Sequence, residues 1–75
     1  MIKYVYILRS IKYPKQHDVG LTSDVRRRLK KHNVGSSAYT KQFVPWKLDA
    51  CVAFVDERKA RAIEKYLKHG SRHAF

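Results

Sequence analysis

The sequence has 75 residues and a formal net charge of +11, which fits one small domain over residues 1–75. Its single cysteine excludes an intrachain disulfide and a multi-cysteine metal site. No apolar stretch approaches the ~20 residues of a membrane span, and no signal-peptide pattern is present. We therefore expect a cytoplasmic protein with a polyanionic partner, nucleic acid being favoured over a membrane surface or an acidic protein.

The first third of the chain predicts an antiparallel hairpin. Strand-forming residues fill 4–8, where Tyr4 and Tyr6 project from the same face because side chains alternate along a strand. The polar segment 9–16, which contains Pro14, predicts the connecting loop. Residues 19–21 then predict a short second strand, antiparallel to the first.

A capped helix is predicted over residues 24–33. Thr22 or Ser23 can serve as its N-cap, and Asp24 suits its first turn. Asn33 and Gly35 are suited to its C-terminal end, because both tolerate the left-handed conformation.

Arg28 and His32 lie four residues apart on this helix, beside the apolar pair Val25 and Leu29. The 3.6-residue period therefore places both side chains on one edge, next to the face that packs on the core. Two interpretations remain open. The pair can belong to a phosphate-cleaving pocket, or the helix can be an ordinary basic helix with long side chains over the core.

Residues 35–45 have the composition of a loop, and a third strand is predicted over 46–55. Strict alternation of apolar residues in that segment indicates one buried face, with Cys51 as a buried, inert thiol. The aromatic residues Tyr39 and Trp46 alternate with basic residues such as Lys41. They can stack on bases over a cationic surface, or they can complete the core.

A second helix is predicted from Asp56, its plausible N-cap, to near Gly70. One of its faces is apolar and carries Ala60, Ile63 and Leu67. The element order is therefore β-β-α-β-α. The expected fold class is α/β, more closely α+β, with a small, mainly antiparallel three-stranded sheet flanked by helices.

Glu64 lies at the border of the buried face of this second helix. One interpretation is an ion pair with Lys68 one turn later, worth only about 0.2–0.5 kcal/mol. The other is a carboxylate ligand for Mg²⁺, which typically takes one or two carboxylates, water and substrate phosphate.

Several short motifs together resemble the GIY-YIG endonuclease family, in particular its short stand-alone bacterial members. The order and spacing of the motifs match over essentially the whole chain, although no single motif is strong. The matching segments are Tyr4-Val5-Tyr6, Val19-Gly20, Arg28 with His32, Pro45-Trp46-Lys47-Leu48, Ala62 to Lys68 around Glu64, Gly70-Ser71 and Ala74-Phe75.

The resemblance implies metal-assisted cleavage of a nucleic-acid phosphodiester bond. In that case Tyr6 would activate or orient water, His32 would assist proton transfer, and Arg28 would hold the scissile phosphate. Glu64 would bind a single Mg²⁺ or Mn²⁺ ion. We expect DNA rather than RNA as the partner, and a domain this small can also bury an apolar patch by self-association. The residues expected to contact the substrate are Tyr4, Gly20, Arg27, Lys31, Tyr39, Lys41 and Trp46.

The chain departs from the family pattern at two positions. Tyr4 stands where the name-giving glycine of the first motif is found, and Asp18 stands where the second motif carries a tyrosine. An acid cannot supply the packing or the hydroxyl of a phenol. Asp18 can act as an extra metal ligand or base, or His17 or Tyr13 can fill the gap. The alternative is a weakened or inactive nucleic-acid-binding module on the same fold.

Overall fold

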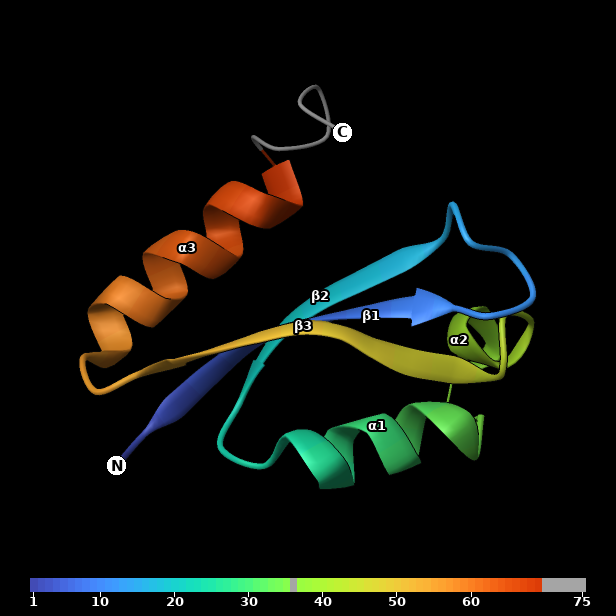
Figure 1. Cartoon of the computed structure of the whole chain (residues 1–75), viewed down its shortest axis with the longest axis horizontal. Coiled ribbons are helices and arrows are strands. Elements are labelled where there is room, and N and C mark those ends of the chain that lie inside the picture. Colours follow the sequence, from blue (N-terminus) through green and yellow to red (C-terminus); the bar gives the residue numbers. More distant parts are fainter. Residues whose placement is uncertain (36, 70–75) are drawn as a thin grey trace.

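A computed structural model, which describes residues 1–35 and 37–69, has a three-stranded sheet with α1 and α3 on opposite sides (Figure 1). Within these residues the expected α+β class and β-β-α-β-α order are confirmed, with one short helix added. The predicted motifs within residues 70–75, and the helix end near Gly70, lie outside the described part. In chain order the elements are β1 (Lys3–Ser10), β2 (His17–Thr22), α1 (Val25–Asn33), α2 (Ala38–Lys41), β3 (Trp46–Phe54) and α3 (Glu57–His69).

The sheet has the strand order β2-β1-β3, and β1 is antiparallel to both neighbours. The predicted hairpin is therefore confirmed. Its register pairs Tyr6 with Gly20 and Leu8 with Asp18. Because paired residues point to the same side of a sheet, the Tyr6 and Asp18 side chains share one face.

The main core lies between this face and α1. Tyr6, Leu8 and Trp46 are buried there, and Val25 and Leu29 of α1 pack against them. The apolar edge of α1 therefore lies on the sheet, as the spacing predicts, and it carries the neighbouring Arg28 and His32 towards the same region.

α1 begins at Val25, one residue later than predicted. Asp24 is the N-cap in place of Thr22 or Ser23, and its carboxylate accepts a hydrogen bond from the Arg27 amide at 3.0 Å. Thr22 is still part of β2, and its hydroxyl oxygen accepts from the Asp24 amide at 3.1 Å. The hydroxyl therefore stabilises the turn before the helix and is not its cap. α1 ends at Asn33, followed by Gly35 at a φ of 73°.

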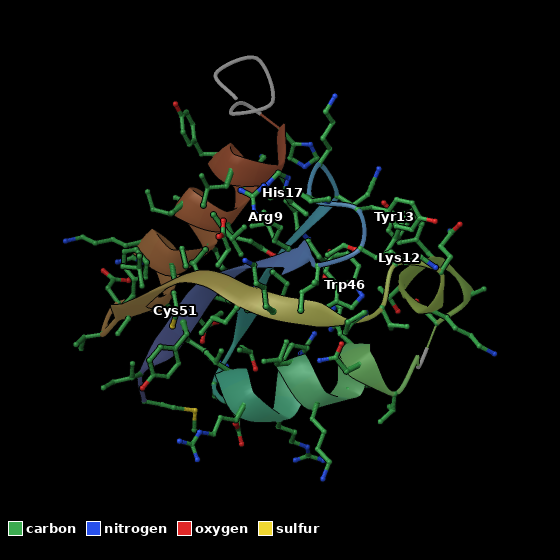
Figure 2. All side chains as sticks on the ribbon, turned by 45° about the vertical axis from the view of Figure 1, so that its right-hand side comes forward. Arg9, Lys12, Tyr13, His17, Trp46 and Cys51 are labelled. Carbon is green, nitrogen blue, oxygen red and sulfur yellow. The ribbon has the colours of Figure 1, made fainter. Side chains whose placement is uncertain are left out.

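The segment predicted as a loop contains the short helix α2. Ser37 caps it by accepting from the Thr40 amide, and the Trp46 indole donates to the Thr40 carbonyl at 3.0 Å. This contact comes from β3, so local composition alone does not predict it. Tyr13 and Lys12 lie near α2 (Figure 2), where the Tyr13 ring meets Phe43 edge-on.

β3 lacks the buried face that its alternating pattern predicts. Trp46 is buried, Phe54 is partly buried, and every residue from Lys47 to Ala53 is exposed, including Val52 at 52%. Cys51 (Figure 2) is exposed too, so the expectation of a buried thiol is wrong. The reason is that alternation shows which residues are apolar but not whether a helix covers them, since β2 is an edge strand as well and has buried residues.

α3 follows Asp56, whose carboxylate accepts from the Arg58 amide at 2.9 Å, in agreement with the predicted cap. Ala60 is completely buried, whereas Ile63 on the same face is 40% exposed. The helix therefore approaches the sheet closely near its first turns. Among residues 1–35 and 37–69, no helix is long and apolar enough to cross a membrane.

Candidate active site

The Tyr6 side chain lies across β2 at Gly20. Tyr6 is 2% exposed, and a Cβ atom added at Gly20 would overlap the phenol oxygen and the ring carbon that bears it. Gly20 is thus needed because the ring occupies the space of a side chain on the neighbouring strand. Gly20, in the second motif, thus makes room for Tyr6, in the first motif, and fixes the position of its ring.

His32 is buried on α1 and lies between two aromatic rings. Its ring meets Tyr6 edge-on at a centroid distance of 6.4 Å and Trp46 at 5.8 Å. The Nδ1 atom of His32 lies 3.1 Å from the Arg28 carbonyl, one helical turn earlier. These contacts fix the plane of the His32 ring. The helix edge predicted to carry Arg28 and His32 therefore packs against the core.

Asp18 completes the surroundings of His32. One of its carboxylate oxygens, Oδ2, contacts the Nε2 atom of His32 in a hydrogen-bonded ion pair. Sequence reasoning identifies Asp18 as a departure from the family pattern but does not predict this partner. The signal that could have found it is the strand register, since Asp18 lies on the same face as Tyr6.

Three charged residues act on the Tyr6 phenol, from three different elements. Burial raises the pKa of Tyr6 above its ordinary value of 10.0, and the negative charges of Asp18 and Glu64 add to this effect. Arg28 opposes it through its positive charge and a side-chain hydrogen bond. The phenol is therefore protonated at neutral pH. Arg28 and Asp18 are its main charged neighbours, whereas Glu64 belongs to α3 on the opposite side of the sheet and its influence is the smallest of the three.

Glu64 of α3 is partly buried, with 23% of its side chain exposed, and its carboxylate pairs with the Lys68 ammonium at 3.3 Å. The simpler interpretation of Glu64, an ion pair along the helix, is thus present. Within residues 1–35 and 37–69, no group of three His, Cys, Asp or Glu residues could hold a metal. A single carboxylate fits a Mg²⁺ ion whose other ligands are water and substrate phosphate.

A cationic cavity of about 260 Å³ opens at the start of α1. Arg28 lines it together with Arg27 and Lys31, and both of these are exposed. The two residues predicted to contact substrate are therefore next to Arg28 and accessible to a polyanion. The remaining lining residues are Thr22, Ser23 and Asp24.

A second and larger groove, of about 1190 Å³, is lined by Asp18, Tyr39 and Lys68 among others. Tyr39 is 54% exposed and Lys41 is also exposed, so both are accessible as predicted substrate contacts. Tyr4 is only partly buried. Arg9 and His17 line the same groove, and Figure 2 shows them on the α3 side of the sheet.

Two predicted substrate contacts are buried and need correction. Trp46 is 2% exposed and packs in the core, so its indole is not available to stack on a base. Its backbone amide and carbonyl bind the side chain of Asn33, which ties β3 to the end of α1. Gly20 is covered by the Tyr6 ring, and its role is to leave space for that ring.

The family model described as "GIY-YIG catalytic domain" matches residues 2–74. The chain belongs to the GIY-YIG family. It is 41% identical over 73 residues to the UPF0213 protein BH0048 of Halalkalibacterium halodurans, and the match covers 96% of the chain and 76% of that protein. It is 42% identical over 55 residues to a UPF0213 protein of Lacticaseibacillus paracasei, covering 72% and 62%. The chain thus spans less than two thirds of that relative's length.

A solved structure supports the same assignment. The solution NMR structure of the UPF0213 protein BH0048 from Bacillus halodurans matches this GIY-YIG domain with a TM-score of 0.61 and 39% sequence identity. The match covers 99% of this chain and 78% of that one. The family resemblance predicted from the short motifs is therefore confirmed.

Proposed function

We propose that this protein is a metal-dependent endonuclease that hydrolyses phosphodiester bonds in nucleic acid, with DNA favoured over RNA. Its place in a family of nucleic-acid endonucleases supports the class of reaction. One observation carries the proposal. Arg28, Asp18 and Glu64 come from three elements, and their charges all act on the buried phenol of Tyr6. Arg28 suits a phosphate beside Tyr6, and the Glu64 carboxylate, whose influence on the phenol is the smallest of the three, would hold the metal ion from α3.

Arg28 is the proposed phosphate ligand. Its planar guanidinium can donate two parallel hydrogen bonds to a phosphate, and its charge stabilises the negative charge that grows on the phosphoryl oxygens in the transition state. It lines the cationic cavity at the start of α1 and also reaches the Tyr6 phenol. A bound phosphate at Arg28 would therefore lie close to Tyr6.

Tyr6 and His32 are the proposed proton-handling and water-orienting groups. The raised pKa of Tyr6 keeps its hydroxyl protonated, so it can donate a hydrogen bond that orients water or a phosphoryl oxygen. The family resemblance implies that His32 assists proton transfer, and since its Nε2 atom contacts the Asp18 carboxylate, this part would run through that carboxylate.

Glu64 is the proposed ligand of Mg²⁺ or Mn²⁺. When bound, the ion polarises the phosphate and stabilises the leaving oxygen. Lys68 pairs with Glu64 at 3.3 Å, and its side chain is 45% exposed, so it can turn away and leave the carboxylate free for a cation. Since the chain offers one carboxylate at this point, we expect substrate phosphate to complete the site.

The proposal is tested with single-stranded, duplex and branched DNA, and with RNA of matched sequence, each with Mg²⁺, with Mn²⁺ or with chelator. We expect metal-dependent cleavage by the wild-type protein. Glu64→Gln should reduce the rate by about 100-fold or more, the scale seen when a group stabilising developing charge is removed. Glu57→Gln is the matched control, because Glu57 is an exposed ion-paired carboxylate on the same helix. Absence of cleavage on every substrate, or equal rates for Glu64→Gln and wild type, contradicts the proposal.

A second candidate function is a non-catalytic nucleic-acid-binding module. The observation that favours it is Asp18, which replaces the tyrosine of the second motif. This function predicts salt-sensitive binding that needs no metal and is unchanged in Glu64→Gln, without cleavage. Asp18→Tyr separates the two, since a defect caused by the departure should be relieved by the family residue. Cytoplasmic location and self-association remain predictions.

A further inference from the structure

The hydrogen bonds of His32 leave neither of its ring nitrogens available to a substrate. A backbone carbonyl can only accept, so Nδ1 must donate to the Arg28 oxygen. The other ring nitrogen, Nε2, is hydrogen-bonded to Oδ2 of the Asp18 carboxylate. His32 is engaged on both sides and holds the carboxylate in place.

Asp18 is more accessible than the histidine that orients it. The side chain of Asp18 is 32% exposed, compared with 11% for His32. Within residues 1–35 and 37–69 only Oδ2 of Asp18 makes a hydrogen bond, which leaves the lone pairs of Oδ1 for water. Asp18 also lines the large groove, whereas His32 lines neither of the two cavities described above.

We propose that Asp18 is the catalytic residue that accepts the proton of the attacking water, and that His32 is the positioning residue that orients its carboxylate. This inference rests on the nuclease function proposed above and assigns the base of the same site. Tyr6 is poorly suited to the task, because it is buried and its pKa is raised. Asp18, which departs from the family pattern, would then supply the general base of the site.

The reaction balances without another reagent. One O–H bond of water breaks, and its proton moves to Oδ1 of Asp18 while the water oxygen forms a bond to phosphorus. The phosphorus–oxygen bond to the leaving sugar oxygen breaks, and that oxygen takes a proton from solvent. Asp18 returns its proton to solvent, which restores the carboxylate.

Two residues lie against the Asp18 carboxylate or on its sheet face. His32 of α1 contacts it, and Tyr6 of β1 lies on the same sheet face. Arg28 of α1 and Glu64 of α3 act on the same phenol as Asp18 does. A tyrosine at position 18 would offer a hydroxyl group to Nε2. Aspartate instead brings a negative charge with a free oxygen, which is the feature a base needs.

The test uses single-turnover cleavage of labelled DNA by the full chain, with affinity measured separately by fluorescence anisotropy in the presence of Ca²⁺. Asp18→Asn keeps the size of the side chain and a partner for Nε2, but its amide is not a useful base. We expect its cleavage rate to fall by about 10²–10⁴-fold, the usual contribution of a general base, with DNA affinity unchanged. Glu57→Gln is the control, because Glu57 is an exposed ion-paired carboxylate that lines neither cavity.

Asp18→Tyr provides a second readout. A phenol is a base only at high pH, whereas a carboxylate is ionised well below neutrality. The acid limb of the rate profile should therefore move to higher pH in Asp18→Tyr. Wild-type rates in Asp18→Asn, or an unchanged profile in a folded Asp18→Tyr, overturn this inference and leave the nuclease function standing. A wild-type protein that cleaves no substrate overturns both.

Discussion

Gly20 and Tyr6 form the contact on which the position of the phenol depends. The two residues are paired across β1 and β2, and the ring fills the space that a side chain at position 20 would need. The helical period alone predicts that Arg28 and His32 share an edge. By contrast, the Gly20 contact and the Asp18–His32 pair depend on strand register and on tertiary packing, so the sequence pattern does not reveal them.

Gly20→Ala is expected to destabilise the protein by about 1–3 kcal/mol, the usual cost of overpacking a well-filled site. The added methyl group must displace the Tyr6 ring, and cleavage should fall as well. Urea denaturation measures the free energy of unfolding. The control is Cys51→Ser, since Cys51 pairs with Tyr6 from the exposed edge strand and should change stability by less than about 0.5 kcal/mol. Equal stability of Gly20→Ala and wild type would show that the ring does not occupy this space.

The raised pKa of Tyr6 predicts a specific dependence of stability on pH. Burial favours the neutral phenol in the folded state, so its contribution is complete below pH 10.0, the ordinary tyrosine value. As the pH rises above that value, the unfolded chain ionises first and this stability is progressively lost. Tyr6→Phe should lack this component. Thermal unfolding of both proteins from pH 8 to 11 measures it, and parallel curves would contradict the shift.

At the level of elements, local patterns predict most of the helices and strands, and tertiary contacts decide the exceptions. The hairpin, α1 and α3 follow from alternation, helical spacing and capping residues. The exposure of β3 could not be predicted, because alternation does not show whether a helix covers the apolar side of a strand. The short α2 depends on the Trp46 indole, which binds its Thr40 carbonyl from another element.

Asn33 links two of these elements and should contribute to stability beyond its place in α1. Its side chain donates to the Trp46 carbonyl at 3.0 Å and accepts from the Trp46 amide. Asn33→Ala removes both bonds, so we expect a loss of about 1–3 kcal/mol at 0.5–1.5 kcal/mol for each bond. Chemical denaturation provides the measurement, with Lys30→Ala on the exposed side of α1 as the control. If both variants unfold at the same denaturant concentration, the link contributes nothing.

For the whole molecule, the charge of +11 predicts strong and salt-dependent attraction to nucleic acid, but it does not say where the strand binds. The structure concentrates Arg27, Arg28 and Lys31 around one cavity at the start of α1. On the other side of the sheet, the first turn of α3 carries the exposed residues Arg58 and Lys59. Variants that remove equal numbers of charges from α1 and from α3 therefore distinguish an effect of total charge on DNA binding from an effect of a local binding surface.

The double variant Arg27→Ala/Lys31→Ala should lower affinity for duplex DNA. It should also reduce the slope of log Kd against log salt by about 2, because each of the two cations neutralises one phosphate. Arg58→Ala/Lys59→Ala removes the same charge and should leave that slope nearly unchanged, because these residues are remote from the α1 cavity. Fluorescence anisotropy over a series of salt concentrations distinguishes the two results. Equal slopes in the two variants would mean that binding follows net charge alone. A smaller slope confined to the α1 variant would place the phosphate backbone beside Arg28, where the proposed cleavage chemistry requires it.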